Sequence, residues 1–167
     1  MEYWDLFNCF GNHVNQRVRR GDPIPAGHYH LAVDIWIVNS KQEFLIQRRA
    51  STKRLFPNIW ATTGGSVLSG ETSFQGCIRE TKEEIGIDIE PKHATVMSRI
   101  IGDNTFWDIW VIRQDFELRQ TSLQLEEVSE VKWVSRNEIM RLAKAEKFLQ
   151  TKYLTELFEY VDGYFQT

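Results

Sequence analysis

The sequence predicts an α/β fold in which helices cover a mixed β-sheet, and three observations support this prediction. Strand-like and helix-like stretches are interspersed without strict alternation, which favours a mixed sheet with helices on its faces. Leu31–Val38 is mostly apolar, as is typical of a strand buried on both faces. The length of 167 residues suits one domain, and no repeat or linker divides the chain. We therefore expect a single domain over residues 1–167.

The N-terminal part is predicted to form a β-hairpin over about residues 2–20, packed on the rest of the domain. Tyr3–Asn8 and Val14–Arg20 have strand composition and are joined by a turn at Gly11 and Asn12. Residues 21–27 contain prolines and glycines and cannot continue a strand. This segment is expected to be an irregular connection within the domain.

A second hairpin precedes a long irregular segment. Leu31–Val38 and Glu43–Arg48 are predicted strands joined by a turn at residues 39–42. Residues 49–70 contain a proline and several glycines, and only Trp60–Thr63 has strand character. Long loops in compact domains are usually functional, so this segment is a candidate part of a site.

The C-terminal half is predicted to contain three helices and three further strands. Thr72–Ile85 has apolar residues at helical spacing, with Thr72 or Ser73 as N-cap and Gly86 as the stop. A capping box starting at Ser135 opens the second helix. The last helix is predicted from a stripe that Gly163 closes, made of Leu149, Tyr153, Leu157 and Val161. The strands are expected at Ala94–Ile101, Thr105–Phe116 and Glu130–Val134.

Charge and cysteine content exclude several classes of function. Lys and Arg number 20 and Asp and Glu 23, so the net charge of -3 disfavours binding of nucleic-acid polymers or of membranes through a polybasic surface. No apolar run approaches the length of about 20 residues that a membrane helix needs. Cys9 and Cys77 form no metal-type pair or disulfide framework, and the N-terminus lacks a signal-peptide pattern. We therefore expect a reduced, cytoplasmic setting.

The predicted helix at residues 72–85 carries an acidic cluster. At about 100° per residue, Glu80, Glu83 and Glu84 project within an arc of about 100°. Like charges at this spacing destabilise an isolated helix, and a hard divalent cation would offset that repulsion. Gly65 and Glu71 precede the cluster in sequence, and Arg79 can orient a carboxylate. The sequence thus indicates a metal site beside an open, glycine-rich loop.

The spacing over Gly65–Ile87 resembles the Nudix box, Gly-x5-Glu-x7-Arg-Glu-U-x-Glu-Glu-x-Gly-U, where U is a bulky aliphatic residue. The only departure is Thr81 at the first U position. Phe56–Trp60 and the late strand Glu130–Val134 also resemble this family, so the resemblance covers the whole chain. It implies the Nudix α/β/α sandwich, with a mixed sheet and the box as a loop–helix–loop.

The resemblance also implies an activity. Nudix hydrolases cleave a nucleoside diphosphate linked to another moiety, with Mg²⁺ or Mn²⁺ activating the attacking water. Glu80 or Glu83 would take the proton, and we favour Glu80, while Arg79 and Glu71 would form an orienting pair. The implied metal ligands are Glu80, Glu83 and Glu84, together with the carbonyl of Gly64 or Gly65. A small-molecule diphosphate is the expected partner, and a homodimer is expected from the family alone.

Other charged residues have two interpretations. Arg48, Arg49 and Lys53 belong to a basic run that either contacts substrate phosphates or is an exposed loop. Asp108 interrupts an apolar strand, so it should be paired, bind a metal or contribute to substrate binding. Asp34 is a weaker candidate, because strand ends and edges tolerate such residues.

Two further groups stay open in the sequence. Glu126 and Glu127 precede the last strand, where an extra acid would suit the site or simply an acidic loop. The strand aromatics are expected mostly in the core, with stacking on a planar ligand as the alternative. They are Trp36, Phe106, Trp107 and Trp110.

Two alternative functions remain. His28, His30 and Phe56–Trp60 also resemble isopentenyl-diphosphate isomerases, but Gly64 and Ser66 stand where those enzymes place a catalytic Cys and a metal-binding His. His28 and His30 are then expected to be strand-edge residues. The second alternative is a non-catalytic ligand-binding module, whose mark would be loss of box carboxylates, and none is lost. The leading prediction is Mg²⁺-dependent hydrolysis of a nucleoside diphosphate derivative.

Overall fold

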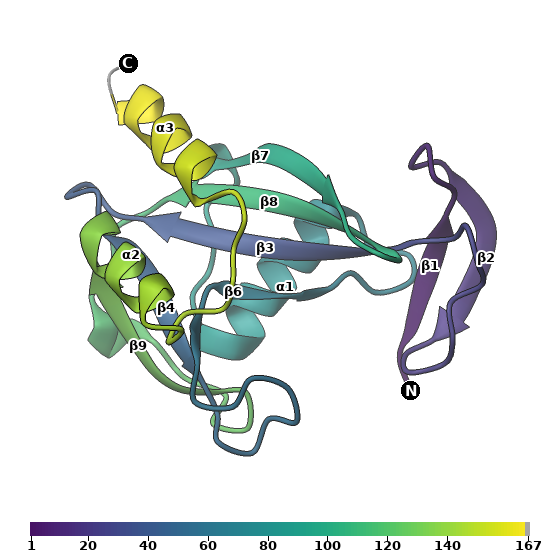
Figure 1. Ribbon diagram of the computed structural model, residues 1–167, viewed down its shortest axis with the longest axis horizontal. Helices are drawn as coiled ribbons and strands as arrows, with labels where there is room; N and C mark the ends of the chain where they lie inside the picture. The colour runs from purple at the N-terminus through teal and green to yellow at the C-terminus, as the bar shows by residue number, and fades with distance from the viewer. Residues whose placement is uncertain (166–167) are drawn as a thin grey trace.

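The order of strands and helices follows the predicted one in the computed structural model, which describes residues 1–165 (Figure 1). Gln166 and Thr167, the end of the predicted domain, lie outside the described residues. The strands are β1 Tyr3–Phe7, β2 His13–Arg19, β3 His30–Val38, β4 Phe44–Arg49, β5 Trp60–Ala61, β6 Thr63–Ser66, β7 Ala94–Ile101, β8 Thr105–Arg113 and β9 Val128–Val134. The helices are α1 Ser73–Ile85, α2 Arg136–Lys144 and α3 Leu154–Phe165, with 3-10 turns η1 Pro91–His93 and η2 Leu118–Gln120.

The main sheet is mixed, as predicted. Its order is β5-β4-β3-β8-β7, with β6 antiparallel to β3 and β9 antiparallel to β4. The central strands β3 and β8 run parallel, with Val33 opposite Asp108 and Ile35 opposite Trp110. A parallel pair needs a crossover connection, and here α1 and β7 lie in the segment between the two strands.

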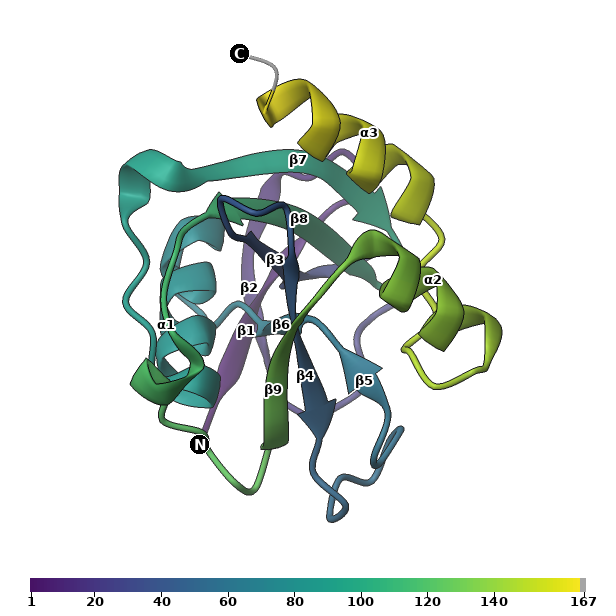
Figure 2. The same ribbon diagram turned by 90° about the vertical axis from the view of Figure 1, so that its left-hand side faces the viewer.

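Helices cover both faces of this sheet (Figures 1 and 2). On one face Val33, Ile35 and Ile37 of β3 pack with residues of α1 such as Cys77 and Ile85. On the other face, Trp36 and Val38 belong to a cluster completed by residues of α2 and α3: Ile139, Leu142, Leu157 and Val161. Because successive strand residues point to opposite faces, β3 supplies both cores. The predicted α/β/α sandwich is confirmed.

Local signals fix α1 where the sequence predicts it. The Thr72 side chain accepts a hydrogen bond from the backbone N–H of Gln75, and Gly86 ends the helix with a φ of 75°. A left-handed residue at this position is accessible to glycine at little cost. Thr81, the departure from the aliphatic pattern, is buried and donates its hydroxyl proton to the carbonyl oxygen of Cys77 at 2.9 Å.

The hairpin β1–β2 forms its own two-stranded sheet at one end of the molecule (Figure 1). It contacts the main sheet through Trp4, which stacks on His30 with ring centroids 4.2 Å apart. His30 is buried at the start of central strand β3, so its predicted place at a strand edge is wrong. Cys9 is exposed in the turn between β1 and β2.

Two predicted elements need correction. α3 begins at Leu154, so Leu149 and Tyr153 lie before it, and Gly163 lies within the helix. The predicted strand Trp60–Thr63 is two short strands, because the chain passes at Thr62 from pairing with β4 to pairing with β3. Among residues 1–165, no helix is both long enough and apolar enough to cross a membrane.

Candidate active site

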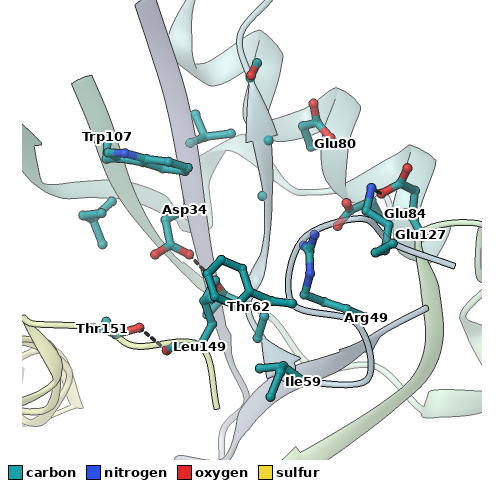
Figure 3. Close-up of a pocket in the computed structure, with 18 of the residues that line it drawn as sticks. Asp34, Arg49, Ile59, Thr62, Glu80, Glu84, Trp107, Glu127, Leu149 and Thr151 are labelled. Atoms are coloured by element: carbon teal, nitrogen blue, oxygen red, sulfur yellow. Dashed lines mark hydrogen bonds and ion pairs between the residues drawn. The ribbon is translucent and has the colours of Figure 1, made fainter. Parts of the chain in front are cut away.

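A cavity of about 1000 Å³ opens where β6 lies against β3 (Figure 3). Residues from both faces of the sheet line it. The box carboxylates reach it from α1, and Asp34 and Trp107 reach it from β3 and β8. The glycine pair Gly64 and Gly65 lies between these two groups.

Glu80 lies directly against the backbone of Gly65. A Cβ atom added to Gly65 would be 2.4 Å from the Cδ atom of Glu80, so no side chain fits there without displacing the carboxylate. Burial raises the pKa of Glu80, although pairing with Arg79 works in the opposite direction. The glycine is therefore required for the close approach of this carboxylate to the loop.

Glu84 is the most deeply buried carboxylate of the box, with 7% of its surface exposed. The side-chain amide of Gln47 donates to its Oε2 atom at 2.7 Å, and the Thr63 hydroxyl donates to Gln47 at 3.0 Å. Burial raises the pKa of Glu84 to about 7, although the hydrogen bond from Gln47 lowers it. Gln47 is a further site residue that was not predicted, and its signal in the sequence is an amide that follows the apolar residues of β4.

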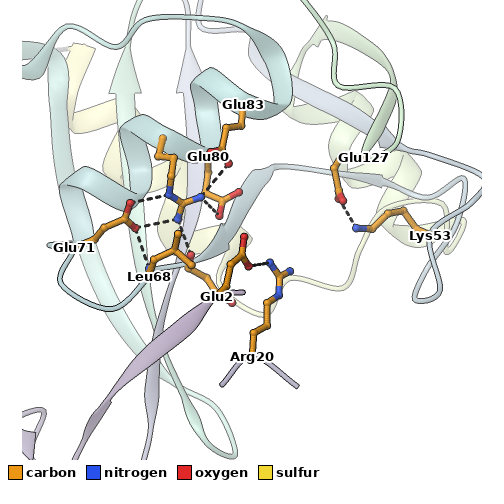
Figure 4. Close-up of polar contacts among 10 residues, drawn as sticks. Glu2, Arg20, Lys53, Leu68, Glu71, Glu80, Glu83 and Glu127 are labelled. Carbon is orange, nitrogen blue, oxygen red and sulfur yellow. Dashed lines mark hydrogen bonds and ion pairs between the residues drawn. The ribbon is translucent and has the colours of Figure 1, made fainter. Parts of the chain in front are cut away.

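Arg79 links three acidic residues of the box, Glu71, Glu80 and Glu83, which are labelled in Figure 4. Its Nε and Nη2 atoms donate to the two oxygens of Glu71 at 2.8 and 3.0 Å. Its Nη1 atom donates to Glu80 at 2.8 Å and to Glu83 at 3.1 Å. Although burial opposes it, the pairing with Arg79 lowers the pKa of Glu71. The predicted orienting pair is thus present as a bidentate ion pair.

The box carboxylates fit a divalent cation by their chemistry. Glu80, Glu83 and Glu84 supply hard oxygen ligands from one side of α1, the type that Mg²⁺ prefers. Within residues 1–165, however, no three acidic, His or Cys side chains are close enough together to hold a metal ion. Arg79 instead supplies positive charge to Glu80 and Glu83. A cation would take over part of that role.

The predicted basic residues divide into two groups. Arg49 and Lys53 line the cavity, where Lys53 forms an ion pair with Glu127. Arg48 is outside the cavity lining, because its guanidinium is directed to the carbonyl oxygen of Asn58 at 3.2 Å and to Glu130 at 4.0 Å. The prediction that Arg48 binds substrate is therefore not supported by its position.

Of the two strand aspartates, Asp34 lines the cavity and Asp108 does not. Asp108 is 3% exposed, is held by Arg99 at 2.6 and 2.9 Å, and is not among the residues that line the cavity. Asp108 is thus paired, which is one of the alternatives predicted for it, and its position does not support a role in substrate binding. Asp34 lies in the middle of β3 rather than at an edge, and it lines the cavity. Burial raises its pKa, although hydrogen bonds from Thr62 and Tyr153 lower it.

The residues relevant to isomerase chemistry are also placed. Gly64 and Ser66, which the resemblance to isomerases expects at the positions of a Cys and a His, line the cavity. Cys77 is fully buried on the core side of α1, and burial raises the pKa of its thiol to about 12. Cys77 therefore cannot supply the missing acid.

Comparison with known proteins shows which family and fold the chain resembles. A model of the NUDIX domain matches residues 28–157. An uncharacterized Nudix hydrolase of Listeria innocua is 36% identical over 160 residues, which cover 95% of either chain. An isopentenyl-diphosphate Delta-isomerase of Cutibacterium acnes is 28% identical over 164 residues, or 90% of this chain and 82% of that protein. A crystal structure of a Deinococcus radiodurans protein has a TM-score of 0.76 at 24% identity, covering 95% of this chain and 98% of that one, and this likeness concerns the fold.

Proposed function

This chain belongs to the Nudix hydrolase family, and we propose that it hydrolyses the diphosphate linkage of a nucleoside diphosphate derivative with Mg²⁺. Family membership makes it a hydrolase that acts on pyrophosphate bonds. The contact between Glu80 and Gly65 carries the finer proposal, because it brings the acidic face of α1 to the wall of the cavity. A cavity of about 1000 Å³ is large enough for a nucleotide.

The roles of the carboxylates follow from their surroundings. Glu80, Glu83 and Glu84 would hold the metal, with the backbone of Gly65 adjacent. When bound, Mg²⁺, or Mn²⁺ in its place, neutralises diphosphate charge and lowers the pKa of a water molecule. We assign the proton acceptor to Glu80. Gln47 fixes the orientation of Glu84 through its amide.

The basic residues would act on the substrate and on the acids. Arg79 holds Glu71 in position through two hydrogen bonds and Glu80 through one. A further hydrogen bond to the Ser66 carbonyl oxygen fixes the guanidinium itself. Arg49 and Lys53 lie on the cavity wall, where cations would contact outer phosphate oxygens. Phosphoryl transfer depends mostly on such positioning and charge stabilisation.

The two alternatives are less well supported. Isomerase activity is disfavoured because Gly64 provides no thiol and Cys77 is buried away from the cavity. The non-catalytic module is disfavoured because every carboxylate of the box is present. The homodimer and the cytoplasmic setting expected from the sequence stay predictions.

The test is a substrate screen combined with a variant. Nucleoside diphosphate sugars, nucleoside triphosphates, dinucleotides and isopentenyl diphosphate would be supplied with Mg²⁺ or Mn²⁺, and phosphate products measured. Glu83→Gln should reduce turnover of the best substrate on the order of 100-fold or more by weakening metal binding. The fold should be unaffected, since the Glu83 side chain is 54% exposed.

The matched control is Asp88→Asn. Asp88 is an exposed acid just after α1 that pairs with Lys82 at 2.7 Å, and its loss should leave turnover unchanged. Full activity of Glu83→Gln, or release of an isoprenoid isomer rather than phosphate, would contradict the proposal.

A further inference from the structure

The cavity contains a second carboxylate, Asp34, that the box chemistry does not use. In the sheet, Asp34 lies opposite Gly64 and Val33 lies opposite Gly65, which contacts Glu80. Strand alternation places Asp34 with Trp36 on the face that α2 and α3 cover, away from α1. Asp34 therefore belongs to a different part of the cavity from the metal-binding acids, yet is separated from them only by the glycine strand.

A chain of hydrogen bonds fixes Asp34 as an acceptor. The indole Nε1 of Trp36, which can only donate, bonds to the hydroxyl oxygen of Tyr153 at 3.0 Å. The Tyr153 hydroxyl donates a hydrogen bond to Oδ2 of Asp34, and the Thr62 hydroxyl donates one to Oδ1. Trp36 lies in β3, Thr62 between β5 and β6, and Tyr153 directly before α3.

The carboxylate has acceptor capacity left. The two hydroxyls occupy one acceptor position on each carboxylate oxygen. An ionised carboxylate offers about four acceptor positions, so roughly two stay available. Because Asp34 lines the cavity, a ligand there can supply the missing donor.

The wall near Asp34 includes aromatic and apolar side chains as well as polar ones such as Thr151 (Figure 3). Trp107 on β8 lies opposite Ala32 of β3, two residues from Asp34 on the same face of the sheet. It is 39% exposed, whereas Trp36 is fully buried, so its ring is open to the cavity. Ile100, Ile109 and Leu149 add apolar surface to this wall. A flat aromatic surface of this kind favours a planar ligand.

We propose that Asp34, Thr62, Trp107, Ile109 and Tyr153, together the Asp34 pocket, bind a nucleobase that has an exocyclic amino group. The inference rests on the proposed function and names its substrate class. The base stacks on Trp107 and its amino group donates to Asp34. A base with a carbonyl at the same place would bring its oxygen, an acceptor, against the Asp34 carboxylate, which is also an acceptor. An isopentenyl chain would supply no donor to the carboxylate.

The test measures binding, so it does not depend on turnover. The α,β-methylene analogues of cytidine and uridine diphosphate differ in an amino group against a carbonyl, and those of adenosine and inosine diphosphate differ in the same way. Each would be titrated by calorimetry with Mg²⁺. We expect the amino-bearing member of at least one pair to bind wild-type protein roughly 10–100-fold more tightly. This factor corresponds to the usual free energy of one hydrogen bond to a charged group.

Asp34→Asn is the decisive variant. The amide is nearly the same size but presents a donor as well as an acceptor, so the amino preference should fall to about one or reverse. Trp107→Leu should weaken both members of a pair by a similar factor, roughly tenfold, because stacking tolerates either base. The control is Asp108→Asn on the neighbouring strand, outside the cavity lining, which should keep the preference.

Two results would overturn the inference. One is equal binding of both members in each pair by wild-type protein. The other is an Asp34→Asn variant that weakens both members equally, with 2′-deoxy analogues showing the same loss, which would assign Asp34 to the ribose. An amino preference without any diphosphate hydrolysis would contradict only the proposed function, and hydrolysis without the preference would contradict only this inference.

Discussion

The two carboxylate groups of the cavity are held in opposite ways. On α1, Glu71, Glu80 and Glu83 share the guanidinium of Arg79. Within residues 1–165, Asp34 forms no ion pair, and it is held by the hydroxyls of Thr62 and Tyr153. Acids held by a cation can exchange it for a metal, whereas an acid held by neutral donors keeps a fixed hydrogen-bond pattern. The difference suits the first group to diphosphate chemistry and the second to recognition of the attached group.

The largest expected effect comes from Glu84→Gln, which separates stability from activity. Burial raises the pKa of Glu84 from 4.5 to about 7, so without metal the unfolded chain loses this proton first as the pH rises. Wild-type stability therefore falls between about pH 4.5 and 7. The variant cannot ionise and should be more stable at pH 8 by as much as about 3 kcal/mol, although it loses hydrolysis.

Urea unfolding in a chelator at pH 4.5 and pH 8 checks this expectation. The difference between variant and wild type should vanish at the lower pH. Glu83→Gln is the matched control, since that side chain is largely exposed and its replacement should leave stability nearly unchanged. A Glu84→Gln protein less stable than wild type at pH 8 would show that ionised Glu84 stabilises the fold.

Gly65→Ala should damage only the acidic side of the comparison. The new Cβ would lie 2.4 Å from the Glu80 carboxylate and displace it. A misplacement of about 1 Å in a catalytic group costs on the order of 100-fold in rate, so turnover should fall by about that factor. The amino preference of the Asp34 pocket should persist. Turnover within twofold of wild type would mean that the position of Glu80 is not critical.

Tyr153→Phe should damage only the Asp34 side. It removes a donor to Asp34 and leaves the buried Trp36 N–H without its acceptor, which should cost about 1–3 kcal/mol in the free energy of unfolding. The amino preference should also shrink. Tyr29→Phe is the control, because its ring keeps the stacking on Phe106, 4.7 Å between centroids. Unchanged stability and unchanged amino preference in Tyr153→Phe would show that the hydrogen bond from Tyr153 does not determine the behaviour of Asp34.

The smallest effect is expected from Gly163→Ala, which touches neither group. A Cβ at Gly163 meets nothing within 4 Å, and the residue lies inside α3. Alanine favours helix over glycine by up to about 1 kcal/mol, so the melting temperature should rise slightly with turnover unchanged. A lower melting temperature would show that the Gly163 backbone is needed as it is.

The acidic group was accessible to sequence analysis because it is local. Glu80, Glu83 and Glu84 lie on one helix, whose period alone brings them together, and Thr72 and Gly86 mark its ends. The mixed sheet followed from the order of elements. The geometry of Arg79 with Glu71 was also predictable as a pair, since both belong to the same motif.

The Asp34 group was not accessible, because it is assembled by tertiary contacts. Thr62 is 28 residues from Asp34 and Tyr153 is 119 residues away. The stripe that includes Tyr153 predicts a helix, because its apolar spacing continues into α3. Asp34 and Asp108 look alike in sequence, and only the direction of each side chain, toward the cavity or toward Arg99, distinguishes them.

The two cysteines make the protein suited to site-specific labelling. Cys77 is enclosed in the core, and the high pKa of its thiol keeps it unreactive near neutral pH. Cys9 is exposed in the turn between β1 and β2. A maleimide dye should therefore attach at Cys9 alone in the folded protein, which would give a fluorescent reporter on the hairpin without any cysteine substitution.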